Sequence, residues 1–159
     1  MKLSITTDDR ELKQTLSQLK KRAGDLTPVM RDIGEIVHRS VRKNFKEGGR
    51  PDKWAESKRA EAEGGQTLID KGRLKNSITV EAGKDSVLIG TNVGYAAVHH
   101  FGFKGSVSIP AHSRKTKKGK ASVKAHSRKL KIAARPFMLV QDSDWKKIDK
   151  AAVRHLTEG

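Results

Sequence analysis

The chain of 159 residues has no cysteine, few aromatic residues and no long apolar run. The absence of cysteine excludes disulfides and thiolate metal sites. Aromatic residues make up 4% and hydrophobic residues 35% of the chain, so any core must be lean. No apolar run approaches the ~20 residues that a membrane-spanning helix needs, and the first residues lack the apolar stretch of a signal peptide. We therefore expect a soluble protein that is not exported by the general secretory route and binds no membrane.

Acidic residues are missing from one long interval. Between Asp85 and Asp142 none of the 56 residues is acidic, whereas eleven are lysine or arginine. The formal net charge is +16, so this interval supplies +11 of it. Such a field attracts polyanions or an acidic partner surface. The predicted partner-binding or polyanion-binding residues are the nine cations of its most basic part: Arg114, Lys115, Lys117, Lys118, Lys120, Lys124, Arg128, Lys129 and Lys131.

Apolar residues at three- and four-residue spacing predict three long helices. They cover residues 8–24, 27–45 and 142–156, and the first follows a short strand at residues 2–6. Gly34 lies inside the second helix, where it either lowers local stability or allows close packing.

Shorter elements are predicted between the long helices. A polar loop at 46–67 holds one helical turn, and a hairpin joins strands at 79–82 and 87–90. Residues 68–78 predict a short helix or turn, residues 95–101 a compact apolar segment, and residues 135–140 a strand. The predicted fold is a single α+β domain over residues 1–159, in which a small antiparallel sheet packs against two long N-terminal helices and a C-terminal helix.

Residues 111–132 have their own pattern. Apolar residues alternate along two stretches around Gly119, and the pentapeptide Ala-His-Ser-Arg-Lys occurs at both 111–115 and 125–129. This pattern predicts a long, basic, β-hairpin-like arm, or a loop that becomes one on docking. A solvated, disordered insert is the alternative on composition.

Patterns typical of catalysis are absent from the sequence. His99 and His100 are adjacent and point in different directions on a helix or a strand, and no helical His-x-x-x-His pattern occurs. The glycine-containing segment 90–94 lacks the lysine and spacing of a phosphate-binding loop. We expect no enzymatic activity, no cofactor, no metal and no small-molecule substrate.

The basic arm also suits contact with nucleic acid. Lysine and arginine neutralise phosphates without reading bases, and the interval from Arg114 to Arg135 has no aromatic residue for base stacking. No known DNA-reading motif is present. A protein that binds nucleic acid without sequence specificity is therefore the alternative function.

Five segments, taken in order, carry a resemblance to a known family. They are Phe45…Gly49-Arg-Pro51…Trp54, Leu68-Ile-Asp-Lys-Gly72-Arg-Leu74-Lys-Asn-Ser77-Ile78, Val87-Leu-Ile-Gly90-Thr91, Tyr95-Ala-Ala-Val-His99-His-Phe101-Gly102 and Arg135-Pro136-Phe137. Together they resemble the tailed-phage virion morphogenesis proteins, the tail-completion or neck family that includes the G-type protein of Mu-like phages. Lys71, where a small hydroxyl residue is expected, and the long basic arm depart from the family pattern.

The resemblance implies a structural protein of the virion, assembled in the host cytoplasm and located at the head–tail junction or the head-proximal end of the tail. It implies a homo-oligomeric ring, often six-fold, with neck, connector or tail-tube proteins as partners, and it leaves room for nonspecific contact with packaged DNA. Tight turns at Gly72 and Gly90 and aromatic anchors of the sheet at Trp54, Tyr95, Phe101 and Phe137 are expected. The predicted framework residues are Trp54, Gly72, Leu74, Gly90, Tyr95, Phe101, Gly102, Pro136 and Phe137.

Overall fold

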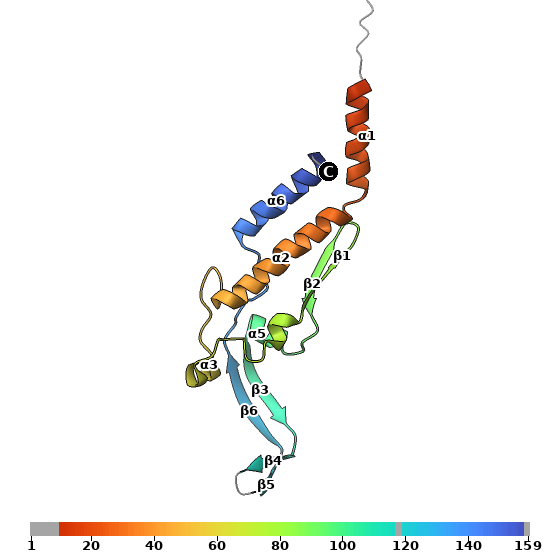
Figure 1. The fold of residues 1–159 in the computed structure, drawn as a ribbon. Coiled ribbons are helices and arrows are strands. Elements are labelled where there is room, and N and C mark those ends of the chain that lie inside the picture. The colour runs from red at the N-terminus through yellow and green to blue at the C-terminus, as the bar shows by residue number, and fades with distance from the viewer. Residues whose placement is uncertain (1–9, 117–118, 158–159) are drawn as a thin grey trace, which may run out of the picture. The chain divides into compact units, whose positions relative to one another are not determined.

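The computed structural model describes residues 10–116 and 119–157 (Figure 1). The helices are α1 (Arg10–Gly24), α2 (Thr27–Glu47), α3 (Lys58–Glu63), α4 (Arg73–Asn76), α5 (Ala96–Phe101) and α6 (Asp142–Thr157). The strands are β1 (Ile78–Ala82), β2 (Val87–Thr91), β3 (Phe103–Ile109), β4 (His112–Thr116), β5 (Gly119–Val123) and β6 (His126–Ile132). The chain divides into two compact units, and the first holds residues up to 43, residues 77–92 and residues from 139 on.

In the first unit the β1–β2 hairpin packs closely on α2. The strands pair antiparallel from Ile78–Thr91 to Ala82–Val87. A methyl group added at Gly34 of α2 would overlap the Val80 side chain and lie 3.2 Å from Val87 Cγ2. Glycine is therefore needed at this position for close helix–strand packing.

Helix α6 is tied to α1 and α2 in the same unit. Arg154 donates to the Asp32 carboxylate of α2 at 2.8 Å, and Arg22 of α1 donates to the Leu156 carbonyl at 3.0 Å. Ser40 of α2 hydrogen-bonds the carboxylate of Asp144, which is 2% exposed. Burial raises the pKa of Asp144, but the hydrogen bonds to it outweigh burial and leave that pKa below its ordinary value.

The second unit has a small aromatic core. Phe45 and Phe137 are 0% and 1% exposed, and their ring centroids lie 5.2 Å apart. Trp54 meets Phe45 edge to face at 5.7 Å, and its indole nitrogen donates to the Pro136 carbonyl at 3.3 Å. Aromatic pairs at such separations add stability beyond their buried area.

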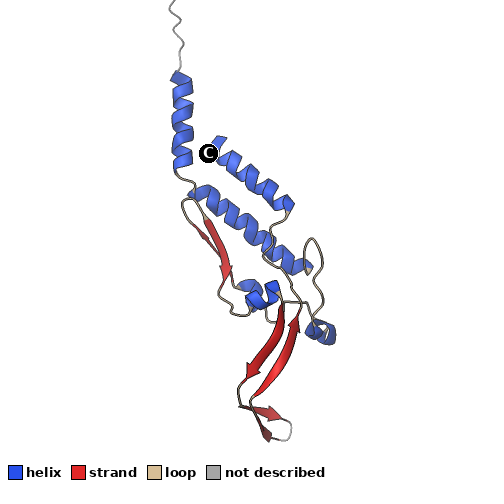
Figure 2. Ribbon diagram, turned by 180° about the vertical axis from the view of Figure 1, so that it is seen from behind, coloured by secondary structure: helices blue, strands red, loops and turns tan. Residues whose placement is uncertain are grey.

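The predicted α+β class is confirmed, with helices beside antiparallel strand pairs. The long helices and the β1–β2 hairpin lie where they were predicted, within a few residues. The strand predicted at residues 2–6 lies outside the described residues. The single small sheet is wrong: the described strands form three separate two-stranded sheets, β1–β2, β3–β6 and β4–β5 (Figure 2).

The strand predicted at 135–140 is also wrong, because this segment bonds elsewhere. The Arg135 amide donates to the His99 carbonyl at 2.8 Å. The Asn44 side chain donates to the Phe137 carbonyl at 2.8 Å, and Trp54 occupies the Pro136 carbonyl. Residues 135–140 therefore form an irregular, partly buried connection whose backbone is bonded by side chains and by α5.

Candidate functional site

The most basic part of the acid-free interval forms two antiparallel ladders within the second unit, here called the double ladder (residues 103–116 and 119–132). Strands β3 and β6 pair from Phe103–Ile132 to Ile109–His126. Strands β4 and β5 pair from His112–Val123 to Thr116–Gly119. Figure 1 shows β3 and β6 as a long ribbon with the shorter β4–β5 pair at its far end.

The repeated pentapeptide begins a strand in each ladder, β4 at its first occurrence and β6 at its second. His112 Nδ1 bonds the Pro110 carbonyl at 3.0 Å, and His126 Nδ1 bonds the Lys124 carbonyl at 2.9 Å. A carbonyl only accepts, so each ring donates from Nδ1. The same local hydrogen bond thus forms twice. Each histidine ring occupies one carbonyl in the two unpaired gaps, residues 110–111 and 124–125, that join the ladders.

One face of each ladder carries only lysine and serine. Side chains on a strand alternate between faces, and directly paired residues share a face. The register therefore places Lys104, Ser106, Ser108, Ser127, Lys129 and Lys131 together in the longer ladder, and Ser113, Lys115, Lys120 and Ser122 together in the shorter one. All ten are exposed. These ten residues are called the Ser/Lys face, which consists of one part on the longer ladder and a separate part on the shorter ladder.

The opposite face of the longer ladder is largely apolar. It holds Phe103, Gly105, Val107, Ile109, His126, Arg128, Leu130 and Ile132. Five of these eight are half-buried, in contrast to the fully exposed Ser/Lys face. The Phe103 ring lies over Gly105, where an added Cβ would be 2.9 Å from Phe103 Cζ.

Two lysine pairs lie directly opposite one another across the ladders. Lys104 pairs with Lys131 in the longer ladder, and Lys115 pairs with Lys120 in the shorter one. Like charges directly opposite each other destabilise a strand pair. Negative charge placed over the Ser/Lys face would relieve this repulsion.

The nine predicted cations do not form one surface. Lys115, Lys120, Lys129 and Lys131 belong to the Ser/Lys face, whereas Arg114 and Arg128 lie on the opposite faces of their strands. Lys124 lies in the gap between β5 and β6. Lys117 and Lys118 lie outside the described residues. Lys104 was not among the predicted residues, because its place opposite Lys131 depends on the strand register.

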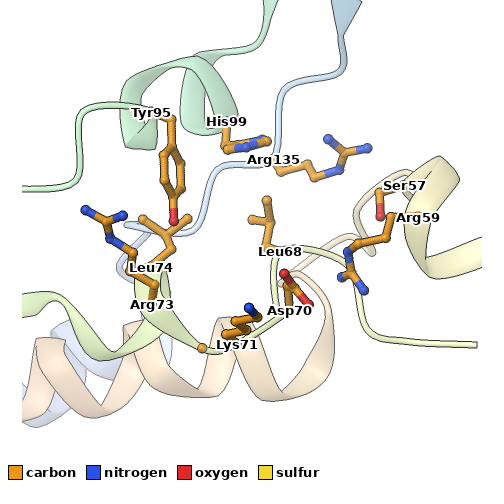
Figure 3. Close-up of a pocket in the computed structure, with 11 residues that line it drawn as sticks. Ser57, Arg59, Leu68, Asp70, Lys71, Arg73, Leu74, Tyr95, His99 and Arg135 are labelled. Atoms are coloured by element: carbon orange, nitrogen blue, oxygen red, sulfur yellow. The ribbon is translucent and has the colours of Figure 1, made fainter. Parts of the chain in front are cut away.

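The second unit also contains a cavity of about 400 Å³ (Figure 3). Its polar lining includes Arg59, Asp70, Lys71, Arg73 and His99, and Leu68, Leu74 and Tyr95 supply apolar contacts. In Figure 3 the Tyr95 hydroxyl points toward Leu74 and Arg73. The lining carries several cations and one carboxylate, so the cavity suits an anion better than a cation.

Arg135 anchors one wall of this cavity by bonding main-chain carbonyls. The side chain is 7% exposed, and its guanidinium donates to the Ala55 carbonyl at 2.8 Å and the Glu56 carbonyl at 3.3 Å. Burial lowers the pKa of Arg135. Its charge lies beside His99, whose buried Nδ1 has no hydrogen-bond partner among the described residues.

We expect the second unit to lose stability as the pH falls below about 6.5. Burial lowers the pKa of His99 and His100 below 6.5, and the charge of Arg135 lowers the pKa of His99 further. A histidine with a lowered folded-state pKa binds its proton more readily in the unfolded chain. Its contribution to stability is therefore complete above the unfolded pKa and declines as the pH falls toward the folded pKa.

Urea unfolding between pH 7.5 and 5 measures this dependence. The double variant His99→Gln/His100→Gln should show a smaller loss of unfolding free energy over that range than the parent chain. An unchanged slope would assign the pH dependence to other groups. The lowered pKa of Asp144 also makes the chain less stable as the pH falls, but only at lower pH, because the ordinary pKa of an aspartate is 3.8.

Neither a metal site nor a membrane span is found in the described part of the chain. No group of three or more histidine, cysteine, aspartate or glutamate residues there could hold a metal ion. No helix among these residues is both long enough and apolar enough to cross a bilayer.

Comparison with known proteins gives a family for this arrangement. Residues 7–157 match the phage virion morphogenesis family. The chain belongs to this family. Mu-like prophage FluMu G protein 2 of Haemophilus influenzae is a similar protein, 36% identical over 106 residues, which are 64% of this chain and 74% of that protein. No solved structure matches the chain.

Several residues in the segments that resemble the virion morphogenesis family lie where a framework residue is expected. Phe137 and Leu74 are buried, Trp54 and Pro136 are half-buried, and Gly72 turns the chain before α4 with a φ of 75°. These placements suit framework roles.

Three framework predictions are corrected. Phe101 is 77% exposed and Tyr95 is 42% exposed, so neither is a core anchor of the isolated chain. Phe101 ends α5, with its ring 4.6 Å from His100, whereas Tyr95 lines the cavity. Gly90 lies inside β2, paired with Thr79, and forms no tight turn.

Sequence reasoning missed the buried polar residues of α2. Asn44 is fully buried, donates to the Phe137 carbonyl and accepts from Arg50 at 2.7 Å. Ser40 is 4% exposed and bonds Asp144. Both stand three residues after a buried valine, Val37 or Val41, so polar residues within the apolar stripe were the available signal.

Proposed function

We propose that this protein is a structural subunit of a tailed bacteriophage that forms a ring, acts in tail completion or head–tail joining, and docks on connector or tail-tube proteins of the virion. The observation that carries the proposal is the family match over residues 7–157. Similarity to a protein named as a Mu-like prophage G protein supports the same reading.

Exposed apolar side chains on α6 suit the contact between subunits. Trp145 is 54%, Val153 58% and Leu156 36% exposed. At 100° per residue these positions lie within about 80° of one another around the helix, so they form one stripe. Tryptophan is enriched among the residues that dominate protein interfaces. A second copy of the chain is the proposed occupant, because a closed ring buries the same stripe in every subunit.

Mass measurement of the purified full chain in solution tests the ring and this contact. The parent chain should be an oligomer of defined mass, and Trp145→Ser/Val153→Ser should be a monomer with an unchanged helix signal. The control Lys146→Ser/Lys150→Ser changes two exposed residues of the same helix and should leave the ring intact.

The outcomes separate the parts of the proposal. A parent chain that is monomeric both alone and with tail tubes would refute the ring. A ring that survives the Trp145/Val153 change would reject only the α6 contact. Binding of the parent ring to isolated tail tubes or connectors, followed by co-sedimentation, tests docking.

A further inference from the structure

We infer that the Ser/Lys face of the double ladder binds the phosphate backbone of duplex DNA without reading its sequence. All ten positions of this face are serine or lysine, and all ten are exposed. Its part on the longer ladder presents three ammonium and three hydroxyl groups, its part on the shorter ladder presents two of each, and neither part has a carboxylate to oppose an anion. That packaged DNA is the natural ligand rests on the proposed function.

The composition favours phosphate over an acidic protein. Lysine and serine are both depleted in protein–protein interfaces, where aromatic residues, methionine and arginine are enriched. Half to two-thirds of the hydrogen bonds between proteins and DNA go to phosphate and sugar oxygens, and lysine and serine are among the usual donors. A face made only of these two residue types therefore fits phosphates better than it fits a folded partner.

The spacing of the charges points the same way. Lys104 and Lys131 face each other across one ladder, and Lys115 and Lys120 face each other across the other. Duplex DNA carries one negative charge per about 1.7 Å of its axis. A ligand of that charge density can neutralise both members of each pair at once, which removes the repulsion within the ladder.

The shape of the double ladder is compatible with a duplex. The major groove admits a two-stranded β-ribbon, and β3–β6 is such a ribbon, with seven residue pairs. The Ser/Lys face has no aromatic side chain to insert between bases and none of the planar side chains (asparagine, glutamine, arginine) that bond base edges with two hydrogen bonds. Lysine carries a compact charge on a flexible stem, which serves phosphates of any sequence. Contact is therefore with the backbone, and the affinity depends little on sequence.

The test measures binding of the full-length protein to a random-sequence duplex by fluorescence anisotropy over a salt series. If all five lysines neutralise a phosphate, log K should fall against log salt with a slope of about −4.5. Affinity should then drop about 500-fold between roughly 50 and 200 mM salt. Lys129→Gln/Lys131→Gln should make the slope shallower by about 1.8.

A matched control separates this face from the general positive field. Arg114→Gln/Arg128→Gln removes the same charge from the same ladders, but from their opposite faces. It should leave the salt slope unchanged. All four side chains are exposed, so unfolding midpoints should match that of the parent chain and show that each variant folds.

Three results would overturn the inference. They are no binding at low salt, equal losses from the lysine and arginine pairs, and displacement of DNA by poly-glutamate at equal charge concentration. The last would assign the face to an acidic protein. Lost DNA binding with intact rings would leave the proposed function standing, whereas lost rings with retained DNA binding would refute the ring alone.

Discussion

Replacement of Phe137 by alanine should lower the free energy of unfolding by about 3–5 kcal/mol, as for other fully buried aromatic residues. The ring is 1% exposed and contacts Phe45 at 5.2 Å and His100 at 5.0 Å, measured between ring centroids. The core of this unit is small, so neighbouring side chains have few ways to fill the cavity. Urea denaturation of the full chain measures the loss.

Phe101 provides the matched control for this prediction. It is the same residue type in the same unit, but it is 77% exposed. Phe101→Ala should change the unfolding free energy of the monomer by no more than ~0.5 kcal/mol. Equal effects of the two changes would contradict the assignment of Phe137 to the core.

Replacement of Gly102 by alanine should lower the free energy of unfolding by about 2–6 kcal/mol, the sum of a backbone effect and a packing effect. Gly102 has φ 78° and ψ 173°, a conformation that residues with a Cβ rarely adopt. The added Cβ would lie 2.9 Å from both the Ala134 amide nitrogen and the Ile132 carbonyl oxygen. Both neighbours are main-chain atoms at the base of the β3–β6 ladder, so the ladder itself must shift.

Gly94→Ala is the control for this substitution. Nothing lies within 4 Å of a Cβ built there, and Gly94 is not among the residues of positive φ. Its effect should stay within about 0.5 kcal/mol. Hydrogen exchange of the β3–β6 amides should accelerate in the Gly102 variant and remain as in the parent for Gly94→Ala.

Regular elements could be predicted because their determinants are local. Helix α2 follows from apolar residues at helical spacing after Thr27, and the β1–β2 hairpin follows from alternation around a glycine-containing turn. Gly34 was recognised as either a weak point or a close contact. The contact with Val80 decides for close packing, and Val80 is 46 residues away in the sequence.

The connection at 135–140 could not be predicted, because its partners are remote. Asn44 and Trp54, which bond its carbonyls, lie 93 and 82 residues away in the sequence. A local pattern cannot show that such side chains replace a neighbouring strand. The aromatic residue at 101 was equally misleading, because residue type alone does not distinguish a core anchor from an exposed ring.

The candidate binding face was only partly visible in the sequence. Excess positive charge predicted the region, and serine or lysine stands at every second position along part of each strand. Which lysines share a face depends on the register, such as Lys104 opposite Lys131. The arginines of the repeated pentapeptide were predicted with the lysines, although pairing places them on the other face.

The double ladder is interrupted at the level where its two ladders meet. The pairing stops at Ile109–His126 and resumes at His112–Val123, so both strands are interrupted at the same level. Pro110 has no amide hydrogen to donate across the gap, and the two histidine rings hold the Pro110 and Lys124 carbonyls locally. No ladder hydrogen bond therefore spans this level, so a change in the angle between the β3–β6 and β4–β5 pairs would break none of them. The angle between the two pairs is thus the degree of freedom by which the double ladder would fit a curved surface.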